Sequence, residues 1–416
     1  MLKNKFINIS SYLFYLIPIA LITGPFIPDL FICLIGLFYI FYRNYKIHED
    51  VRTNTFIKIF FIFYFYILIR SLFSENISLS LESSLFYFRF GIFVLAVNYL
   101  LKNNLINIKL TSNLYLIVLT FISIDCIFQF ITGVNFIGLQ RYGSRLSSFF
   151  TGYNNIYNNL VVGNYLARLL PISLALILMT FSINKKNIYI FIAYLNIVCL
   201  ATLLSGERVT ILNLTILIIF FSIINFGFRK YFIFNSLIII LASSVLILSN
   251  SLLKERLINE TLKQIHPDHT TNFQIISSSH HPIIVNAYRN FKDNMVFGHG
   301  PKLYREICKK YDQKDNSCNT HPHNTYIQLL AETGLIGFSF IFIFFLIISF
   351  KIGKFLLINL NNYVDQKTTS YYLLLILIFS NLFIYQPTMN FFHNWISVIY
   401  YLPISFLFYF NEFKKN

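Results

Sequence analysis

The sequence predicts an all-α polytopic membrane protein of about twelve transmembrane helices, with one large extracytoplasmic loop between the ninth and the tenth. The composition is the first reason: 56% of the 416 residues are hydrophobic and 12% are charged, which excludes a water-soluble fold. The second is that apolar runs recur along the whole chain, each extending to the roughly twenty residues that a bilayer requires. The third is that basic residues gather in alternate loops, which indicates a fixed orientation in a membrane.

Polar breaks divide the chain into the predicted transmembrane segments. The first follows Lys3 and Lys5, shows no small-residue cleavage pattern and leads straight into the second, so we expect it to be retained. In order, the segments are 6–22, 26–42, 56–73, 85–101, 111–132, 157–182, 187–204, 209–227, 231–250, 325–350, 369–386 and 394–411.

The placement of positive charge predicts that both termini are cytoplasmic. With this orientation, most lysines and arginines outside the long loop lie at cytoplasmic ends. The short outer loops hold Arg70, Arg141, Arg145 and Arg208. This asymmetry explains the net charge of +16, so we expect membrane lipids as partners and no nucleic acid.

One polar region interrupts the apolar pattern and becomes the large loop. It carries a predicted amphipathic helix near Ile283 to Phe297 and a turn at Gly298-His299-Gly300-Pro301. A shorter outer loop at 133–157 is rich in Gly, Asn, Ser and Tyr, which suits a loop that lines a cavity. The predicted parts are 1–250 with helices one to nine, 251–324 with the large loop, and 325–416 with helices ten to twelve.

The five cysteines fall into two groups. Cys33, Cys126 and Cys199 lie inside apolar helices, where a small packing residue is the simplest interpretation. Cys308 and Cys318 lie ten positions apart in the large loop, in a compartment where disulfides persist, so we expect them to be bridged.

Two histidines stand directly before the tenth helix, in the string Cys318-Asn-Thr-His-Pro-His-Asn-Thr-Tyr-Ile-Gln-Leu-Leu-Ala-Glu-Thr-Gly-Leu-Ile-Gly337. Thr325 and Gln328 fit a capping box, and the positive end of the helix would disfavour protonation of His321 and His323. A neutral histidine can act as a general base. Surface residues or a zinc pair are the alternatives, but no Cys, Asp or third His stands nearby at ligand spacing, so no metal is expected.

This string and the Gly298-His-Gly-Pro301 turn closely resemble the signature of the O-antigen ligase and polymerase superfamily, the WaaL and Wzy-like membrane glycosyltransferases. In that family an HxHN motif ends the large periplasmic loop, and its second histidine is thought to be the catalytic base. The resemblance therefore implies that His323 is the base and that His321 and Asn324 bind substrate. His321 could instead share the base role or support the Pro322 turn.

The resemblance extends to arginines between about residues 140 and 340. Leu204-Ser-Gly-Glu-Arg208 looks like the family's arginine after a Ser-rich turn, and Arg289 stands about ten residues before the Gly-x-Gly turn, as another family arginine does. A third element, Arg-x-x-Gly-x-Phe with a later Asn-Pro-Asn, is present only in part from Arg145 to Asn155, and its proline is missing. Arg208 and Arg289 are thus expected at the catalytic centre, with Arg145 as a weaker substrate contact.

The resemblance implies transfer of a glycan from undecaprenyl diphosphate to an acceptor on the periplasmic face of the inner membrane, in lipopolysaccharide biosynthesis. Arginines can bind a pyrophosphate bidentately and stay charged, so Arg208 and Arg289 could stabilise the leaving group while His323 deprotonates the acceptor. No cofactor is expected. The structural alternative for Arg208 is an interfacial anchor, and for Arg289 the solvated face of a surface helix.

The sequence leaves the acceptor open. Ligation of O-antigen to the lipid A core is the first expectation, with a growing glycan in a polymerase or a protein Ser or Thr in an O-oligosaccharyltransferase as alternatives. From other classes, a transporter is disfavoured because the polar signal lies in outer loops rather than at the bilayer midplane, and a noncatalytic scaffold would not need these residues.

Overall fold

The computed structural model describes residues 2–150, 160–265, 278, 280–312 and 317–413. Over these residues the chain is helical, apart from two isolated β-bridges in the loop after α7. The long helices are α1 (Leu2–Ala20), α2 (Phe26–Arg43), α4 (Thr55–Leu72), α6 (Phe88–Lys102), α7 (Ile108–Thr132), α8 (Val162–Thr180), α9 (Ile188–Leu204), α10 (Arg208–Ile223), α11 (Arg229–Ser249), α16 (Thr325–Asn359), α17 (Gln366–Asn381) and α18 (Asn394–Phe413). The short ones are α3 (Ile47–Thr53), α5 (Ile77–Ser84), α12 (Ser251–Lys254), η3 (Glu255–Asn259), α13 (Glu260–Ile265), α14 (His281–Asp293), α15 (Tyr304–Ile307) and η5 (Cys308–Tyr311).

The helices support a multi-pass membrane protein by their length and composition, although not the predicted number of crossings. Each predicted segment coincides with one long helix, but only eight helices of the described chain are both long and apolar enough to span a membrane. α9, α10 and the apolar part of α18 are shorter, and α17 has 16 residues. Eight crossings are therefore supported by length and composition, and twelve are not confirmed.

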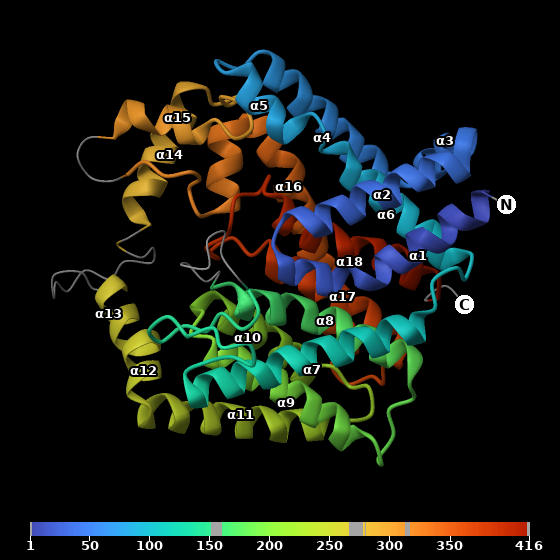
Figure 1. Ribbon diagram of the computed structural model, residues 1–416, viewed down its shortest axis with the longest axis vertical. Helices are drawn as coiled ribbons and strands as arrows, with labels where there is room; N and C mark the ends of the chain where they lie inside the picture. Colours follow the sequence, from blue (N-terminus) through green and yellow to red (C-terminus); the bar gives the residue numbers. More distant parts are fainter. Residues whose placement is uncertain (1, 151–159, 266–277, 279, 313–316, 414–416) are drawn as a thin grey trace.

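α8 and α17 form the centre of the bundle (Figure 1). They pack against each other, with α7, α9 and α10 against α8 on one side and α18 against α17 on the other. Burial follows this arrangement: 89% of the apolar window of α8 is buried inside the protein, against 11% for α11. α11 therefore presents apolar side chains to the surroundings, as a lipid-facing helix does.

The region between α11 and α16 carries the short helices α12 to α15 on one end of the bundle (Figure 1). The predicted amphipathic helix is α14, whose buried face packs on α16. The predicted Gly298 turn docks where α16 kinks at Gly334 (φ +62°), and a Cβ on Gly298 would lie 2.4 Å from the Gly334 nitrogen. Only glycines allow this close backbone approach, which holds α14 and α15 above the start of α16.

Two ionisable residues inside the helices, Arg89 and Asp125, are held by specific partners. Arg89 Nε donates to Asp29 Oδ1 over 2.7 Å and its Nη2 donates to Asn394 over 2.9 Å, which ties α6 to α2 and α18. Asp125 accepts from the Ser148 hydroxyl over 2.5 Å. Pairing within the protein therefore explains why Arg89 and Asp125 are tolerated inside apolar helices.

Candidate functional site

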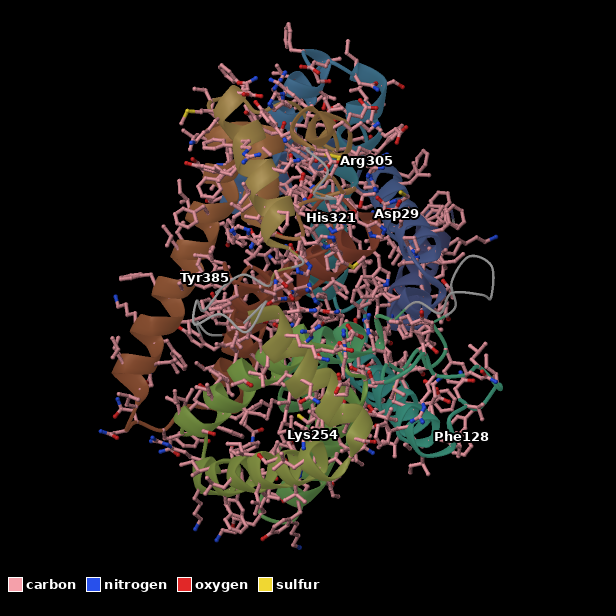
Figure 2. All side chains as sticks on the ribbon, turned by 90° about the vertical axis from the view of Figure 1, so that its left-hand side faces the viewer. Asp29, Phe128, Lys254, Arg305, His321 and Tyr385 are labelled. Atoms are coloured by element: carbon pink, nitrogen blue, oxygen red, sulfur yellow. A yellow bond between two sulfur atoms is a disulfide. The ribbon has the colours of Figure 1, made fainter. Side chains whose placement is uncertain are left out.

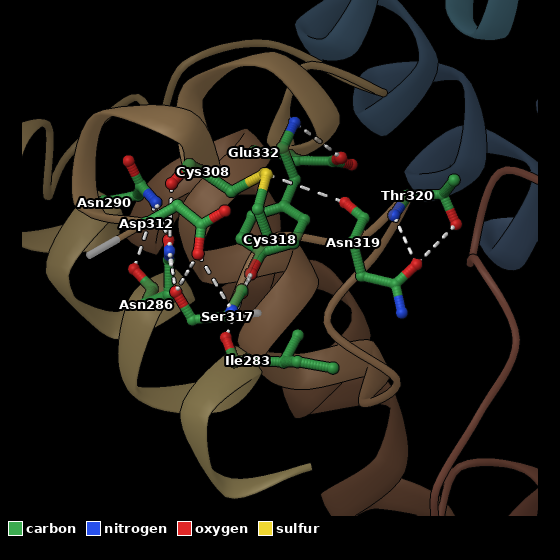
Figure 3. The surroundings of a disulfide bond; sticks show 11 residues. Ile283, Asn286, Asn290, Cys308, Asp312, Ser317, Cys318, Asn319, Thr320 and Glu332 are labelled. Atoms are coloured by element: carbon green, nitrogen blue, oxygen red, sulfur yellow. Dashed lines mark hydrogen bonds between the residues drawn. A yellow bond between two sulfur atoms is a disulfide. The ribbon is translucent and has the colours of Figure 1, made fainter. Parts of the chain in front are cut away.

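The segment before α16 is fixed by the Cys308–Cys318 disulfide and by polar contacts around it (Figure 3). Asn286 of α14 donates to the Cys308 carbonyl over 2.9 Å and to the Ser317 hydroxyl over 3.0 Å. These contacts join α14, η5 and the chain entering the histidine motif. The loop is thereby anchored on both sides before it reaches His321.

α16 begins at Thr325 as predicted, but the capping residue is different. Asn324 Oδ1 accepts from the backbone N–H groups of Tyr326 and Ile327, so Asn324 is the N-cap. The expected Thr325–Gln328 capping box is wrong, because the Thr325 hydroxyl pairs with Thr388 at 2.9 Å instead. Asn324 is the N-cap rather than Thr325, because its backbone is extended and its side chain accepts hydrogen bonds from two backbone amides at once.

Asn324 also donates through Nδ2 to the Ile384 carbonyl over 2.8 Å. Next to it, the His323 carbonyl accepts from Thr388 N–H over 2.8 Å, and His323 has φ of 57°. A left-handed conformation is uncommon for a histidine and persists only where the surroundings enforce it. The 384–388 segment thus holds the backbone of His323 and the side chain of Asn324 through these two hydrogen bonds, and so fixes the position of the His323 ring.

Three imidazoles gather at this point. The ring centroid of His323 lies 4.1 Å from that of His321 and 5.0 Å from that of His280, which directly precedes α14. Burial lowers the pKa of His323 to about 4, and the neighbouring His280 acts in the same direction. Burial likewise lowers the pKa of His321 to about 3. His323 is therefore neutral at physiological pH, chiefly through burial rather than through the helix end that the sequence suggested.

The hydrogen bond to Asn319 assigns the tautomer of His323. Asn319 Oδ1 accepts from Thr320 N–H over 2.7 Å, which turns its Nδ2 towards His323 Nε2 at 3.1 Å. Asn319 Nδ2 can only donate, so His323 Nε2 accepts. The proton of the neutral His323 ring therefore resides on its Nδ1. The lone pair that a general base needs is thus on Nε2, where it accepts one hydrogen bond from the neutral Asn319 side chain.

Two carboxylates that flank the site in the sequence, Glu207 and Glu332, have partners other than His323. Glu332 is fully buried and accepts from Gln328 Nε2 over 2.9 Å and from Tyr304 N–H over 3.3 Å. Glu207 accepts from Gly163 N–H over 2.7 Å. Neither carboxylate faces solvent, and Asn319 takes the position next to the ring.

Arg208 stands at the start of α10 and approaches the histidines through His280, whose pKa is lowered by burial and by the charge of Arg208. Its Nη1 donates to Gln264 Oε1 of α13 over 2.8 Å and to the Thr261 hydroxyl over 3.3 Å. The nearest carboxylate, Glu260, is 3.9 Å from Nη2. Neutral partners therefore hold Arg208 by hydrogen bonds, and the nearest carboxylate, Glu260, is shared with Arg256.

Two further arginines surround the turn before α10. Arg256 of η3 pairs with Glu260, the carboxylate that Arg208 approaches, and donates through Nε to the Gly206 carbonyl over 3.2 Å. Arg145 donates through Nη2 to the Leu160 carbonyl over 2.7 Å, while its buried Nε has no partner in the structure. Gly206 lies between them, and its φ of +71° and the Ser144 carbonyl oxygen, 2.7 Å from where a Cβ would lie, favour glycine at this position.

Arg305 of α15, rather than Arg289, lies beside His321 (Figure 2). The charge of Arg305 contributes to the lowered pKa of His321, and its Nε is buried without a partner. Arg289 is exposed on α14, and no contact among the described residues joins it to the three histidines. The distal part of the Arg145 to Asn155 element lies outside the described residues.

The sequence missed Asn319, His280, Arg256 and Arg305. Each is polar and lies in the 251–324 region, where polar residues are common and periodicity gives no direction to a side chain. For Arg305 and Arg256 the sequence held one weak indication of an inward-facing side chain, since each stands beside apolar residues in a short helix. Among the described residues, no three His, Cys, Asp or Glu side chains are arranged to hold a metal ion.

Comparison with known proteins places this geometry in a family context. Residues 192–342 match the family model Wzy_C, described as O-antigen ligase. The matched range runs from α9 into α16 and includes Arg208, His280, Arg305, His321 and His323, whereas Arg145 precedes it. No curated protein matches the chain. The family match supports glycan transfer of the O-antigen ligase or polymerase type.

Proposed function

We propose that this chain transfers a glycan from undecaprenyl diphosphate to an acceptor hydroxyl, with His323 as the general base, and that the usual acceptor is the lipid A core. The observation that carries the proposal is the neutral His323, whose Nε2 lone pair is held by Asn319 within reach of an arginine-lined region of the matched domain. The active face is proposed to be periplasmic and the membrane the bacterial inner membrane, as the charge asymmetry of the loops suggests.

The reaction is a single displacement. The acceptor oxygen takes the place of Asn319 Nδ2 at His323 Nε2 and gives up its proton there while it bonds to the anomeric carbon. The bond from that carbon to the phosphate oxygen breaks, and its electron pair leaves with undecaprenyl diphosphate. Attack opposite the leaving group inverts the anomeric centre, and the step needs no cofactor and no covalent intermediate.

Arginines neutralise the leaving pyrophosphate in this proposal. Arg208 donates its hydrogen bonds to neutral partners and the Nε of Arg145 has no acceptor, so both can donate hydrogen bonds to phosphate oxygens without breaking a strong ion pair. Arg289, exposed on α14, is proposed to reach the donor when it binds, and His321 and Asn324 to shape the acceptor side. Because the arginines supply positive charge directly, transfer is proposed to be independent of a metal ion.

The test is the surface glycolipid profile of a deletion strain complemented with wild type, His323→Ala or the control His281→Ala. His281 is exposed at the start of α14, next to His280 but outside the imidazole cluster. We expect wild type and His281→Ala to restore glycan on the lipid A core, and His323→Ala to leave unsubstituted core with accumulated lipid-linked glycan. Core bearing a single repeat would indicate a polymerase, and an unchanged profile in the deletion strain would overturn both assignments.

A further inference from the structure

The far end of α16 carries a hollow that the proposed transfer does not use. It has a volume of about 820 Å³ and lies between the second half of α16, the 363–365 segment and the first turns of α17. We call it the lysine hollow; the lining residues that matter here are Leu346, Phe350, Lys351, Lys354, Tyr363 and Asp365. Its size is that of a site for a lipid or another small ligand.

One half of the lysine hollow is apolar and faces outward. Leu346, Phe350 and Tyr363 are 47%, 71% and 67% exposed, although a soluble protein rarely exposes such side chains together. In a membrane-spanning chain, this exposure places them against lipid hydrocarbon. The floor is rigid, because Phe355 and Tyr372 stack with ring centroids 3.4 Å apart.

The other half of the hollow carries a net positive charge, from two lysines against one acid. Lys351 and Lys354 are one turn apart on α16, are exposed, and form no ion pair among the described residues. The single acid in the lining, Asp365, caps α17: it accepts from Thr368 N–H over 2.8 Å and from the Thr368 hydroxyl over 2.5 Å. Its oxygens are therefore committed to their own helix.

The hollow lies at the membrane surface opposite to the histidines. Lys351 follows the kink at Gly334 by 17 residues, which corresponds to roughly 26 Å along the second part of α16 and approaches the hydrocarbon thickness. The turn between α8 and α9 marks the same end, since Ile183 N–H donates to Gln366 Oε1 of α17 over 3.2 Å. This places the lysines near the level of the lipid headgroups, with Leu346 more than one turn closer to the hydrocarbon and Phe350 directly before Lys351.

We propose that the lysine hollow binds an anionic phospholipid, with the phosphate on Lys351 and Lys354 and the upper acyl carbons along Leu346 and Phe350. Two lysines match a phosphate carrying net negative charge. A zwitterionic lipid would also bring an ammonium group, for which the hollow offers one acid, Asp365, whose two oxygens each already accept a hydrogen bond from Thr368. Basic pockets beside transmembrane helices select anionic headgroups in this way.

The experiment uses the full chain in detergent and measures retained lipid by native mass spectrometry after addition of phosphatidylglycerol or phosphatidylcholine. Wild type should retain phosphatidylglycerol in preference, and Lys351→Gln with Lys354→Gln should lower its retention about tenfold or more without changing retention of phosphatidylcholine. The matched control is Lys185→Gln with Lys186→Gln, two exposed lysines at the same membrane end that do not line the hollow. This control should behave as wild type.

Equal loss in the two double variants would show general surface charge and overturn the proposal, as would equal retention of the two lipids by wild type. A third arm adds inorganic phosphate, which should leave the lipid bound; displacement would mean a site for free anions. Phe350→Ser tests the apolar wall and should weaken retention while both lysines remain. The readout is lipid retention alone, so its outcome is independent of glycan transfer.

Discussion

Two arginines on the helical scaffold, Arg43 and Arg89, differ from the arginines near the histidines in how fully their donors are used. Arg43 forms two hydrogen bonds to Asp50, at 2.6 and 2.7 Å, and Arg89 is held by Asp29, Asn394 and a backbone carbonyl. In contrast, the buried Nε atoms of Arg145 and Arg305 have no partner, and Arg208 relies on neutral groups.

The difference separates structural arginines from those available to a ligand. A buried donor without a partner costs free energy, so it persists where a substrate supplies the missing acceptor or where catalysis needs it. A guanidinium whose N–H groups already donate to a carboxylate has few donors left for a phosphate. Substitutions in the two groups should therefore affect different measurements.

The largest expected effect is at Arg208. Arg208→Lys should lower the transfer rate by about 10²-fold or more with unchanged thermal stability, because an ammonium cannot form the paired hydrogen bonds to phosphate. Arg89→Ala is the contrast: it should lower the free energy of unfolding by about 3 kcal/mol, since it leaves the mostly buried Asp29 without its partner. Full activity of Arg208→Lys would contradict a role in phosphate binding and favour the alternative that Arg208 is an interfacial anchor.

Arg305 is expected to show a smaller loss. Arg305→Ala should reduce transfer by about tenfold while folding normally, because it removes charge beside His321 without breaking any hydrogen bond or ion pair in the described structure. Arg289→Ala serves as comparison from the exposed face of α14. Thermal melting and transfer rate measured on the same samples would separate the two roles, and a stability loss for Arg305→Ala would make it a structural residue.

Gly206 tests whether the arginine cluster depends on backbone geometry. Gly206→Ala should destabilise the protein by about 1–3 kcal/mol and lower transfer, because φ is +71° and the new Cβ would lie 2.7 Å from the Ser144 carbonyl oxygen. Gly353→Ala is the control, since nothing lies within 4 Å of a Cβ there. Equal stability of the two variants would show that the turn has room to relax.

The pH dependence of transfer should report His323. Its pKa is lowered from 6.5 to about 4, so the neutral base persists as pH falls below 6.5 and activity should decline only towards pH 4. Asn319→Asp places a negative charge beside the ring, which stabilises the imidazolium and should move the acid limb to higher pH by about one unit or more. An acid limb that stays in place would remove Asn319 from the site.

The helices could be predicted because the bilayer imposes a length and a composition on each. α17 shows the limit: its 16 residues are almost wholly buried between other helices, so protein packing replaces the apolar length that a lipid-exposed span needs. The amphipathic α14 was also predictable, since its apolar face repeats with helical spacing. The number of complete crossings depends on such packing and was not predictable.

For the site, the sequence could indicate residues but not their partners. His323 and Arg208 stand in motifs that are contiguous in the chain, whereas His280 and Arg305 reach the same place through the folding of α14 and α15. The N-cap was misassigned because two neighbouring residues, Asn324 and Thr325, both suit that role, and only the position of Thr388 decides between them. Long-range contacts of this kind leave no trace in local spacing.

Transfer by purified protein tests the central claim most directly. The assay combines lipid-linked glycan, an acceptor and a chelator with wild type, His323→Ala or His281→Ala, and follows the product on gels. We expect His281→Ala to match wild type and His323→Ala to lose at least about 10²-fold in rate while folding normally. A His323→Ala protein that transfers glycan at the wild-type rate would contradict the account.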